Sequence, residues 1–152
     1  MGGELSTEDL IDRLGRLEDE RAIVATLYRY GDALDHDNRQ EFLECFTDDA
    51  DYLVSMRVDA RNGFGYHGHE ELGAYFDGHT HAPAAFHKHV TTNPLVTVDG
   101  HTADAQSYFL RVDSPAAGPA VVVAVGRYVD RFERGDDGRW RIRVRRCEVE
   151  NL

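Results

Sequence analysis

The chain is short of cysteine, of basic residues and of long apolar runs. Its 152 residues include two cysteines, Cys45 and Cys147. Two thiols cannot build the disulfide framework of a small secreted domain or the four-ligand site of a zinc ribbon. The first residues lack the basic and apolar stretches of a secretory signal, so we expect a reduced, cytoplasmic protein. No apolar run approaches the length that crosses a bilayer, about 20 residues, and we expect no membrane partner.

Positive charge is outweighed by negative charge. The chain has 17 Lys and Arg residues against 28 Asp and Glu residues, and its formal net charge is −11 at pH 7. Phosphate backbones and anionic lipids repel such a surface, so we expect no nucleic-acid partner. Hydrophobic residues make up 41% of the chain, which is too many for a disordered protein. The length predicts one domain over residues 1–152, with residues 1–16 as an N-terminal extension or helix.

The first half of the chain has helical periodicity. Ser6 and Asp9 form a capping pair before a first helix, and a longer helix is predicted over residues 18–36. Shorter helices are predicted over residues 40–46 and 69–76, with a strand that starts at Asp51. The long helix has one broad apolar face, which must cover a sheet. That face contains Ile23, Leu27, Tyr30 and Leu34.

The second half alternates between apolar and polar residues and is rich in valine and threonine. This pattern is typical of β-strands, and residues 98–101 between the first two form a hairpin turn. The predicted strands cover residues 87–98, 103–112, 120–133 and 140–149. Three helices followed by four antiparallel strands predict an α+β domain with the helices on one face of a curved sheet.

Asp35 and His89 are the strongest candidates for catalysis. Asp35 lies at the end of an otherwise apolar helix face, where a carboxylate must be paired or protonated. It could instead bond the backbone at the helix end. His89 starts a strand and shares its face with Thr91 and Asn93, which indicates a pocket wall or a solvated strand. A histidine that meets a carboxylate across an apolar cavity is a general-base dyad, suited to elimination, dehydration or isomerisation without a cofactor.

Two histidine pairs raise the alternative of a metal site. His67 and His69, and likewise His87 and His89, lie two residues apart, so each pair would share one strand face. Two imidazoles with a nearby carboxylate could hold zinc or iron. No helical His-x-x-x-His or cysteine ligand set completes such a site. We therefore predict no metal and no cofactor.

Several short motifs follow one another in the order that is typical of one superfamily. Over nearly the whole chain, the pattern resembles the SnoaL-like branch of the nuclear-transport-factor-2-like superfamily. That resemblance implies a cystatin-like cone with three N-terminal helices packed on a curved, mainly antiparallel sheet. The motifs are Leu17-Glu18-Asp19-Glu20-Arg21-Ala22-Ile23, Leu34-Asp35, Phe46-Thr47-Asp48-Asp49-Ala50, His89 with Asn93-Pro94, Gly126-Arg127-Tyr128-Val129-Asp130 and Asp137-Gly138-Arg139-Trp140.

Within the superfamily, the chain is most similar to the group of scytalone dehydratase, bile-acid 7α-dehydratase and hexachlorocyclohexane dehydrochlorinase. The resemblance implies that Asp35 and His89 are the catalytic dyad and that Tyr30, Tyr52 and Arg145 bind substrate. Tyr30 and Asp35 lie about 140° apart on an ideal helix, so both can line the pocket only if the helix ends or distorts near Gly31. A phase slip at residues 145–146 predicts a bulge that turns one arginine inward. A second strand histidine, which scytalone dehydratase has, finds no counterpart at residues 106–108.

The resemblance implies a cofactor-independent lyase or isomerase that acts on a small apolar oxygenated substrate such as a polyketide, terpenoid or steroid. The superfamily also contains proteins without catalytic activity. The alternatives are therefore a non-catalytic small subunit, similar to the β subunits of ring-hydroxylating dioxygenases, and a module that binds a small ligand. The open face of the sheet predicts a homotrimer or homodimer.

Overall fold

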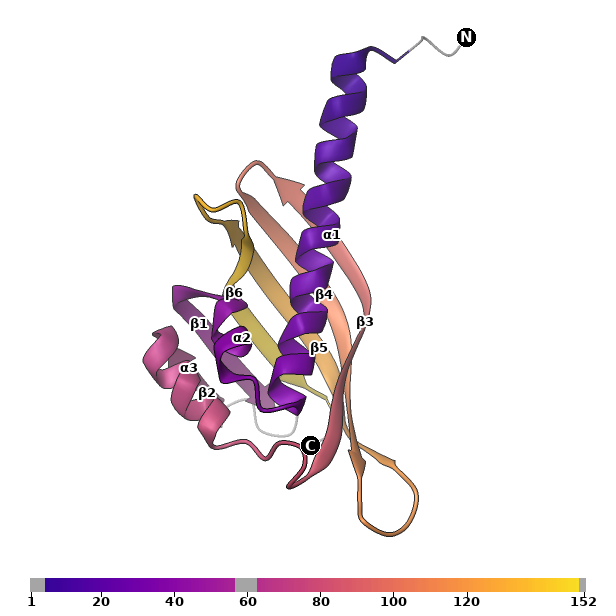
Figure 1. The fold of residues 1–152 in the computed structure, drawn as a ribbon, viewed down its shortest axis with the longest axis vertical. Helices are drawn as coiled ribbons and strands as arrows, with labels where there is room; N and C mark the ends of the chain where they lie inside the picture. Colours follow the sequence, from indigo (N-terminus) through magenta and orange to yellow (C-terminus); the bar gives the residue numbers. More distant parts are fainter. Residues whose placement is uncertain (1–4, 57–62, 151–152) are drawn as a thin grey trace.

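The computed structural model describes residues 5–56 and 63–150. These residues form three helices and six strands, arranged as Figure 1 shows. The helices are α1 (Thr7–Asp35), α2 (Arg39–Glu44) and α3 (Gly68–Asp77). The strands are β1 (Phe46–Met56), β2 (Phe64–His67), β3 (Phe86–Asp99), β4 (Thr102–Ser114), β5 (Val121–Arg134) and β6 (Trp140–Val149).

The sheet has the strand order β2-β1-β6-β5-β4-β3. All neighbouring strands are antiparallel except β1 and β6, which are parallel. The helices lie along one side of this curved sheet, and α1 runs across it (Figure 1). The predicted α+β class and the mainly antiparallel sheet are therefore confirmed. The predicted strand that starts at Asp51 corresponds to β1, and the four later predicted strands correspond to β3, β4, β5 and β6. Strand β2 was not predicted because it has only four residues and directly precedes α3.

Two predicted boundaries differ from the structure. The short helix predicted over residues 40–46 ends at Glu44, and Phe46 is already the first residue of β1, five residues before the predicted start. The two helices predicted before residue 36 are one continuous helix, α1. Ser6 caps it as predicted, since its Oγ accepts from the Asp9 N–H at 3.1 Å and the Asp9 carboxylate accepts from the Ser6 N–H at 3.1 Å. Helix propagation needs no second start signal once this cap has formed.

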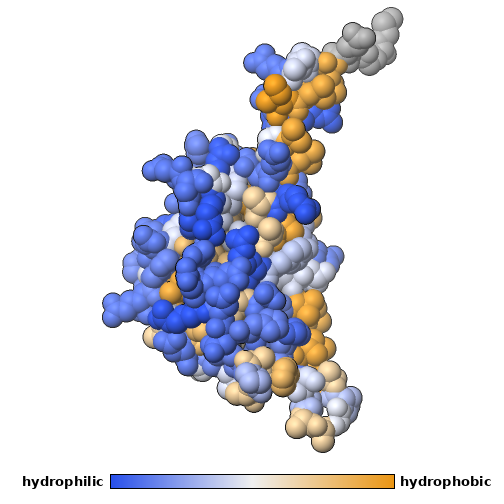
Figure 2. All heavy atoms as spheres, in the orientation of Figure 1, coloured by the Kyte–Doolittle hydropathy of each residue, from blue (hydrophilic) through white to orange (hydrophobic). Residues whose placement is uncertain are grey.

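The two halves of α1 have different surroundings. Its C-terminal half buries the predicted face of Ile23, Leu27, Tyr30 and Leu34 completely against the sheet and α2. Its N-terminal half extends beyond the sheet (Figure 1) and exposes apolar side chains, which Figure 2 shows at the projecting end. These residues are Leu10, Ile11, Leu14 and Leu17, each more than half exposed.

An irregularity in β6 decides which arginine enters the core. Val144 pairs with Arg131 and Ile142 pairs with Phe132, which leaves Arg143 as one extra residue in β6. The inward positions therefore change phase, and Arg145 points into the core. The predicted bulge exists, but it lies at Arg143 and not at residues 145–146. Arg146 is exposed.

Gly31 lets α1 approach β3 closely. A methyl group added at Gly31 would lie 2.7 Å from the backbone carbonyl oxygen of His89, which is shorter than any ordinary carbon–oxygen contact. The neighbour is backbone and cannot swing aside. The absence of a side chain at Gly31 therefore sets the distance between the end of α1 and the start of β3.

Substitution of Gly31 tests this constraint. Gly31→Ala should lower the free energy of unfolding by about 1–3 kcal/mol because the added methyl group forces α1 away from β3. Gly15→Ala is the matched control, since nothing lies within 4 Å of a methyl group there. It should raise stability by up to about 1 kcal/mol through helix propensity. Urea unfolding followed by circular dichroism measures both. Similar gains in the two variants would contradict the argument.

Candidate active site

Asp35 and His89 form a hydrogen-bonded pair between the end of α1 and the start of β3. The His89 backbone N–H donates to Oδ2 of Asp35 at 3.0 Å, and the His89 ring nitrogen Nδ1 lies 2.6 Å from Oδ1. The Asp35 side chain is 3% exposed. Burial raises the pKa of Asp35, but the side-chain and backbone hydrogen bonds from His89 outweigh it and hold that pKa below its ordinary value of 3.8.

The ionised Asp35 carboxylate fixes the tautomer of His89. A carboxylate can only accept hydrogen bonds, so the short contact requires a proton on Nδ1 of His89. The other ring nitrogen, Nε2, is then the acceptor of the neutral imidazole. The His89 side chain is 9% exposed and lines a cavity. This arrangement gives the ring the form of a general base held by a carboxylate behind it.

The cavity beside His89 has a volume of about 220 Å³. Drug-sized ligands occupy pockets of about 300–1,000 Å³, so this cavity suits a small molecule. Its lining is mostly aromatic and aliphatic. The described residues that line it are Tyr30, Tyr52, Val54, Met56, Phe64, Tyr75, His79, His89, Phe109, Arg111, Ala124, Tyr128, Cys147 and Val149.

Tyr30 and Asp35 both serve the site although they point in different directions from α1. We expected that both residues could line the cavity only if the helix ended or was distorted near Gly31. The structure instead shows one helix that continues through Gly31 to Asp35. Tyr30 faces the cavity, whereas Asp35 faces β3 and reaches the cavity only through His89. The two side chains thus point in different directions from a regular helix and still serve one site.

Three tyrosine hydroxyls form a chain in the cavity wall. The hydroxyls of Tyr30 and Tyr52 lie 3.2 Å apart, and those of Tyr52 and Tyr75 lie 3.4 Å apart. Burial raises the pKa of all three well above 10, so they stay protonated at neutral pH. They can therefore donate hydrogen bonds to an oxygen of a bound molecule.

Arg145 lies beneath the cavity and is not among its described lining residues. Its Nε and Nη2 each donate to the Asp130 carboxylate at 2.8 Å, and both side chains are fully buried. Its guanidinium carbon lies 4.2 Å from the centre of the Tyr30 ring and 4.0 Å from that of Tyr128. Burial alone would lower the pKa of Arg145, but the Asp130 charge raises it, so the arginine stays charged. The resemblance implied substrate contact for Arg145; in the structure its contacts are with Asp130 and with the rings of Tyr30 and Tyr128.

His87 is a second imidazole beside Asp35. Its Nε2 lies 3.5 Å from Oδ1 of Asp35, has no hydrogen-bond partner, and belongs to a side chain that is 1% exposed. Burial lowers the pKa of His87, and the nearby His89 adds to this effect. The His87 and His89 rings share one face of β3, as predicted, with centroids 5.3 Å apart. The other predicted pair was wrong, because His67 ends β2 and His69 lies in α3.

Asp35, His87 and His89 also have the composition of a metal site. Their ligand atoms lie within 4.8 Å of one another, and two imidazoles with a carboxylate suit zinc or iron. Both carboxylate oxygens of Asp35 already accept from His89. A metal bound to Nδ1 of His89 would displace the proton on that nitrogen, which is the proton that defines the dyad. Absence of a metal stays a prediction.

Sequence reasoning missed two polar residues of the cavity, His79 and Arg111. The His79 ring lies 4.7 Å from the Tyr75 ring and 5.9 Å from the His89 ring. Burial lowers the pKa of His79 to about 4, helped by His89 and the charge of Arg111. His79 follows α3 in an irregular segment, where no periodicity reveals a facing direction. Arg111 is two residues from the buried Phe109 in β4, and that alternation was the available signal.

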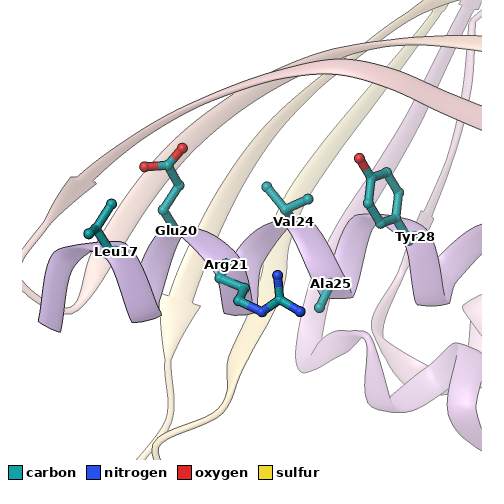
Figure 3. A pocket seen from close by; sticks show the side chains of 6 residues that line it. All are labelled: Leu17, Glu20, Arg21, Val24, Ala25 and Tyr28. Carbon is teal, nitrogen blue, oxygen red and sulfur yellow. The ribbon is translucent and has the colours of Figure 1, made fainter. Parts of the chain in front are cut away.

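A second concave surface lies on α1 itself. It is lined by Leu17, Glu20, Arg21, Val24, Ala25 and Tyr28, whose side chains Figure 3 shows along the helix. These described residues include one carboxylate and one guanidinium but no imidazole. The groove therefore lacks the acid–base pair of the cavity beside His89.

None of the described helices is long and apolar enough to cross a membrane.

Residues 15–146 match the SnoaL-like domain family. A search of curated proteins found no match. Among solved structures, an NTF2-like protein with a cystatin-like fold from Novosphingobium aromaticivorans is 26% identical. Its TM-score is 0.83, and the alignment covers 97% of this chain and 92% of that one.

Two further solved structures from the same organism share the fold. A provisionally assigned scytalone dehydratase is 22% identical, with a TM-score of 0.70 and coverage of 88% of this chain and 85% of that one. A β subunit of a provisionally assigned aromatic-ring-hydroxylating dioxygenase is 23% identical, with a TM-score of 0.73 and coverage of 90% and 92%. The cystatin-like fold predicted from the resemblance is thus confirmed. These neighbours differ in activity, so the fold alone does not select one.

The structural role of Arg145 can be tested by a double-mutant cycle. Arg145→Met leaves the Asp130 charge buried without a partner and should lower the free energy of unfolding by about 3–5 kcal/mol. The double variant Arg145→Met with Asp130→Leu removes both charges and should recover most of that loss. Urea unfolding measures each variant. A double variant no more stable than Arg145→Met would contradict the role of the pair.

The lowered pKa of His79 predicts a pH dependence of stability. The folded protein binds this proton near pH 4, whereas the unfolded chain binds it near pH 6.5. Stability should therefore fall as the pH drops from 6.5 towards 4, by up to about 1.4 kcal/mol per pH unit for this one proton. His79→Gln should reduce that slope, although the slope due to His87 remains. Urea midpoints across this range measure it, with the exposed His101→Gln as control. Equal slopes in wild type and His79→Gln would refute the prediction.

Proposed function

The chain belongs to the SnoaL-like domain family, and from this premise we propose that it is a cofactor-independent lyase or isomerase of the dehydratase type. His89 is the general base and Asp35 is the residue that orients it. The observation that carries the proposal is the 2.6 Å contact between Nδ1 of His89 and Oδ1 of Asp35 at the wall of an apolar cavity. The fold supports the proposal but does not decide it, because a provisionally assigned scytalone dehydratase and a dioxygenase β subunit share it.

The chemistry begins with proton abstraction by His89. Nε2 of the neutral ring takes a proton from a carbon of the substrate, and the ionised Asp35 stabilises the imidazolium that forms. The electron pair of the broken C–H bond becomes a C=C bond while the bond from the neighbouring carbon to its hydroxyl breaks. The proton held by His89 then passes to the departing hydroxide, which leaves as water. The reaction balances without an oxidant, a reductant or a cofactor.

The tyrosine chain supplies donors for the leaving oxygen. Tyr30, Tyr52 and Tyr75 are protonated and lie in the same cavity as His89. A hydrogen bond to an oxygen that gains negative charge is stronger in the transition state than in the ground state, and such a difference accelerates the reaction. Without a leaving group, return of the proton to another carbon gives isomerisation at the same site.

The cavity lining favours a small, largely apolar, oxygenated substrate of polyketide or terpenoid type, or a steroid. Aromatic and aliphatic side chains provide most of the contact surface, and the polar groups are few. The volume of about 220 Å³ favours the smaller of these compounds. We propose a homotrimer or homodimer as the assembled form.

A non-catalytic subunit is the second candidate. The observation that favours it is the exposed apolar surface on the projecting half of α1, since such surfaces often mark protein–protein contacts. A dioxygenase β subunit shares the fold. Under this alternative, the isolated chain turns over no substrate and copurifies with a different polypeptide.

Substitution of the dyad tests the proposed activity. His89→Ala removes the base and Asp35→Asn removes the charge that orients it, so each should lower turnover by about 10²–10⁴-fold. The measurement is loss of water from a panel of small cyclic β-hydroxy ketones, followed by mass spectrometry. Solvent deuterium incorporation detects isomerisation in the same samples.

Two exposed residues provide matched controls for these variants. His101→Ala and Asp104→Asn carry the same chemical changes at exposed positions near the β3–β4 turn. Both should keep wild-type turnover. Circular dichroism must show that the dyad variants remain folded. Full activity in folded His89→Ala or Asp35→Asn would exclude the proposed mechanism.

A further inference from the structure

Arg111 lies directly beside the proposed base. In the pairing of β3 with β4, Arg111 is the cross-strand partner of His89, and in the pairing of β4 with β5 it is the partner of Ala124. All three residues line the cavity. Directly opposite residues have their Cβ atoms about 4.5–5.5 Å apart and point to the same face of the sheet. The register therefore places the Arg111 side chain beside that of His89 on the same face of the sheet.

The positive charge of Arg111 has no counterpart elsewhere in the cavity wall. Within the described lining, the tyrosines are protonated and neutral, and the lowered pKa of His79, about 4, makes its ring neutral at pH 7. No aspartate or glutamate is among the described lining residues. The protein as a whole carries a net charge of −11, which repels anions at long range. Within the described lining, Arg111 is therefore the group that would attract an anionic part of a ligand.

Arg111 forms an ion pair with Asp113, and a ligand carboxylate could take the place of Asp113 in it. Nε and Nη2 of Arg111 donate to the Asp113 carboxylate at 2.9 and 3.5 Å, with side chains 32% and 38% exposed. Ion pairs of this exposure contribute little to the free energy of unfolding. Rearrangement of the Arg111 guanidinium group therefore costs little free energy. Asp113 lines a separate hollow of about 630 Å³, which Arg111 also borders. Arg111 therefore borders both the cavity beside His89 and the hollow that contains Asp113.

We infer that Arg111 binds a carboxylate of the substrate, so that the molecule processed at this site is a small organic acid. The inference rests on the proposed function and names its substrate class. Guanidinium groups recognise carboxylates through paired, charge-assisted hydrogen bonds, which fix orientation as well as affinity. The carboxylate anchors the acid at Arg111 while a different carbon of the same molecule meets Nε2 of His89.

Equilibrium binding of a matched pair of ligands tests the inference. Cinnamate and cinnamamide have the same shape and differ in charge. Isothermal titration calorimetry on the full chain should show cinnamate binding at least about tenfold more tightly than cinnamamide. Arg111→Gln should remove this preference by weakening cinnamate alone, and Arg111→Lys should keep part of it. Arg131→Gln, an exposed arginine on β5, should keep the wild-type preference.

Unchanged affinity for cinnamamide in Arg111→Gln shows that the variant still forms the cavity. Absence of a charge preference in the wild type, or an equal preference in Arg111→Gln, would overturn the inference. The His89→Ala variant separates this test from that of the proposed function. If it keeps full turnover while Arg111→Gln loses the preference, the dyad mechanism fails and the carboxylate site stands. If turnover depends on His89 but no preference exists, only the carboxylate site fails.

Discussion

The close approach of α1 to β3 is the constraint on which the site depends. Gly31 allows the helix backbone to pass over the carbonyl of His89, and four residues later Asp35 meets the His89 ring and backbone N–H together. One carboxylate thus receives two hydrogen bonds from one residue, which holds both the position and the tautomer of the imidazole. A wider gap would leave a buried aspartate with no donor, at a cost of several kcal/mol or a neutral, protonated form.

Two of the aspartates that the structure describes are buried, and they have different partners. Asp130 is paired with Arg145, whose charge is permanent, and this pair lies between Tyr30 and Tyr128 below the cavity. Asp35 is paired with the imidazole of His89, which lines the cavity. The first pair contacts the rings of two tyrosines that line the cavity. The second pair includes a side chain that faces the space where a ligand would lie.

The parts of the site that sequence reasoning located are those with a regular pattern. Asp35 stands out because it breaks an apolar helix stripe. The change of alternation in β6 predicted one inward arginine, and the structure shows that it is Arg145. His79 could not be found, since it follows α3 where neither a period of two nor of 3.6 applies. Arg111 was overlooked because a long polar side chain on a strand usually faces solvent, although its alternation with the buried Phe109 and its register with His89 both indicate its direction. Two helices were predicted where α1 is one continuous helix. The capping pair at Ser6 marks where this helix starts, but no residue near position 18 indicates that it continues.

The burial of Asp35 bears on the choice between the proposed enzyme and a non-catalytic subunit of the same shape. Replacement of a buried polar or charged pair by apolar residues of similar volume often leaves a protein equally or more stable. Stability alone therefore does not explain why Asp35, with a side chain 3% exposed, carries a carboxylate behind the wall of a cavity. His87 adds to this cost, because its buried Nε2 lacks a hydrogen-bond partner. Unfavourable polar groups gathered at one cavity are typical of sites where the chemistry requires them, and this favours the catalytic reading of the dyad.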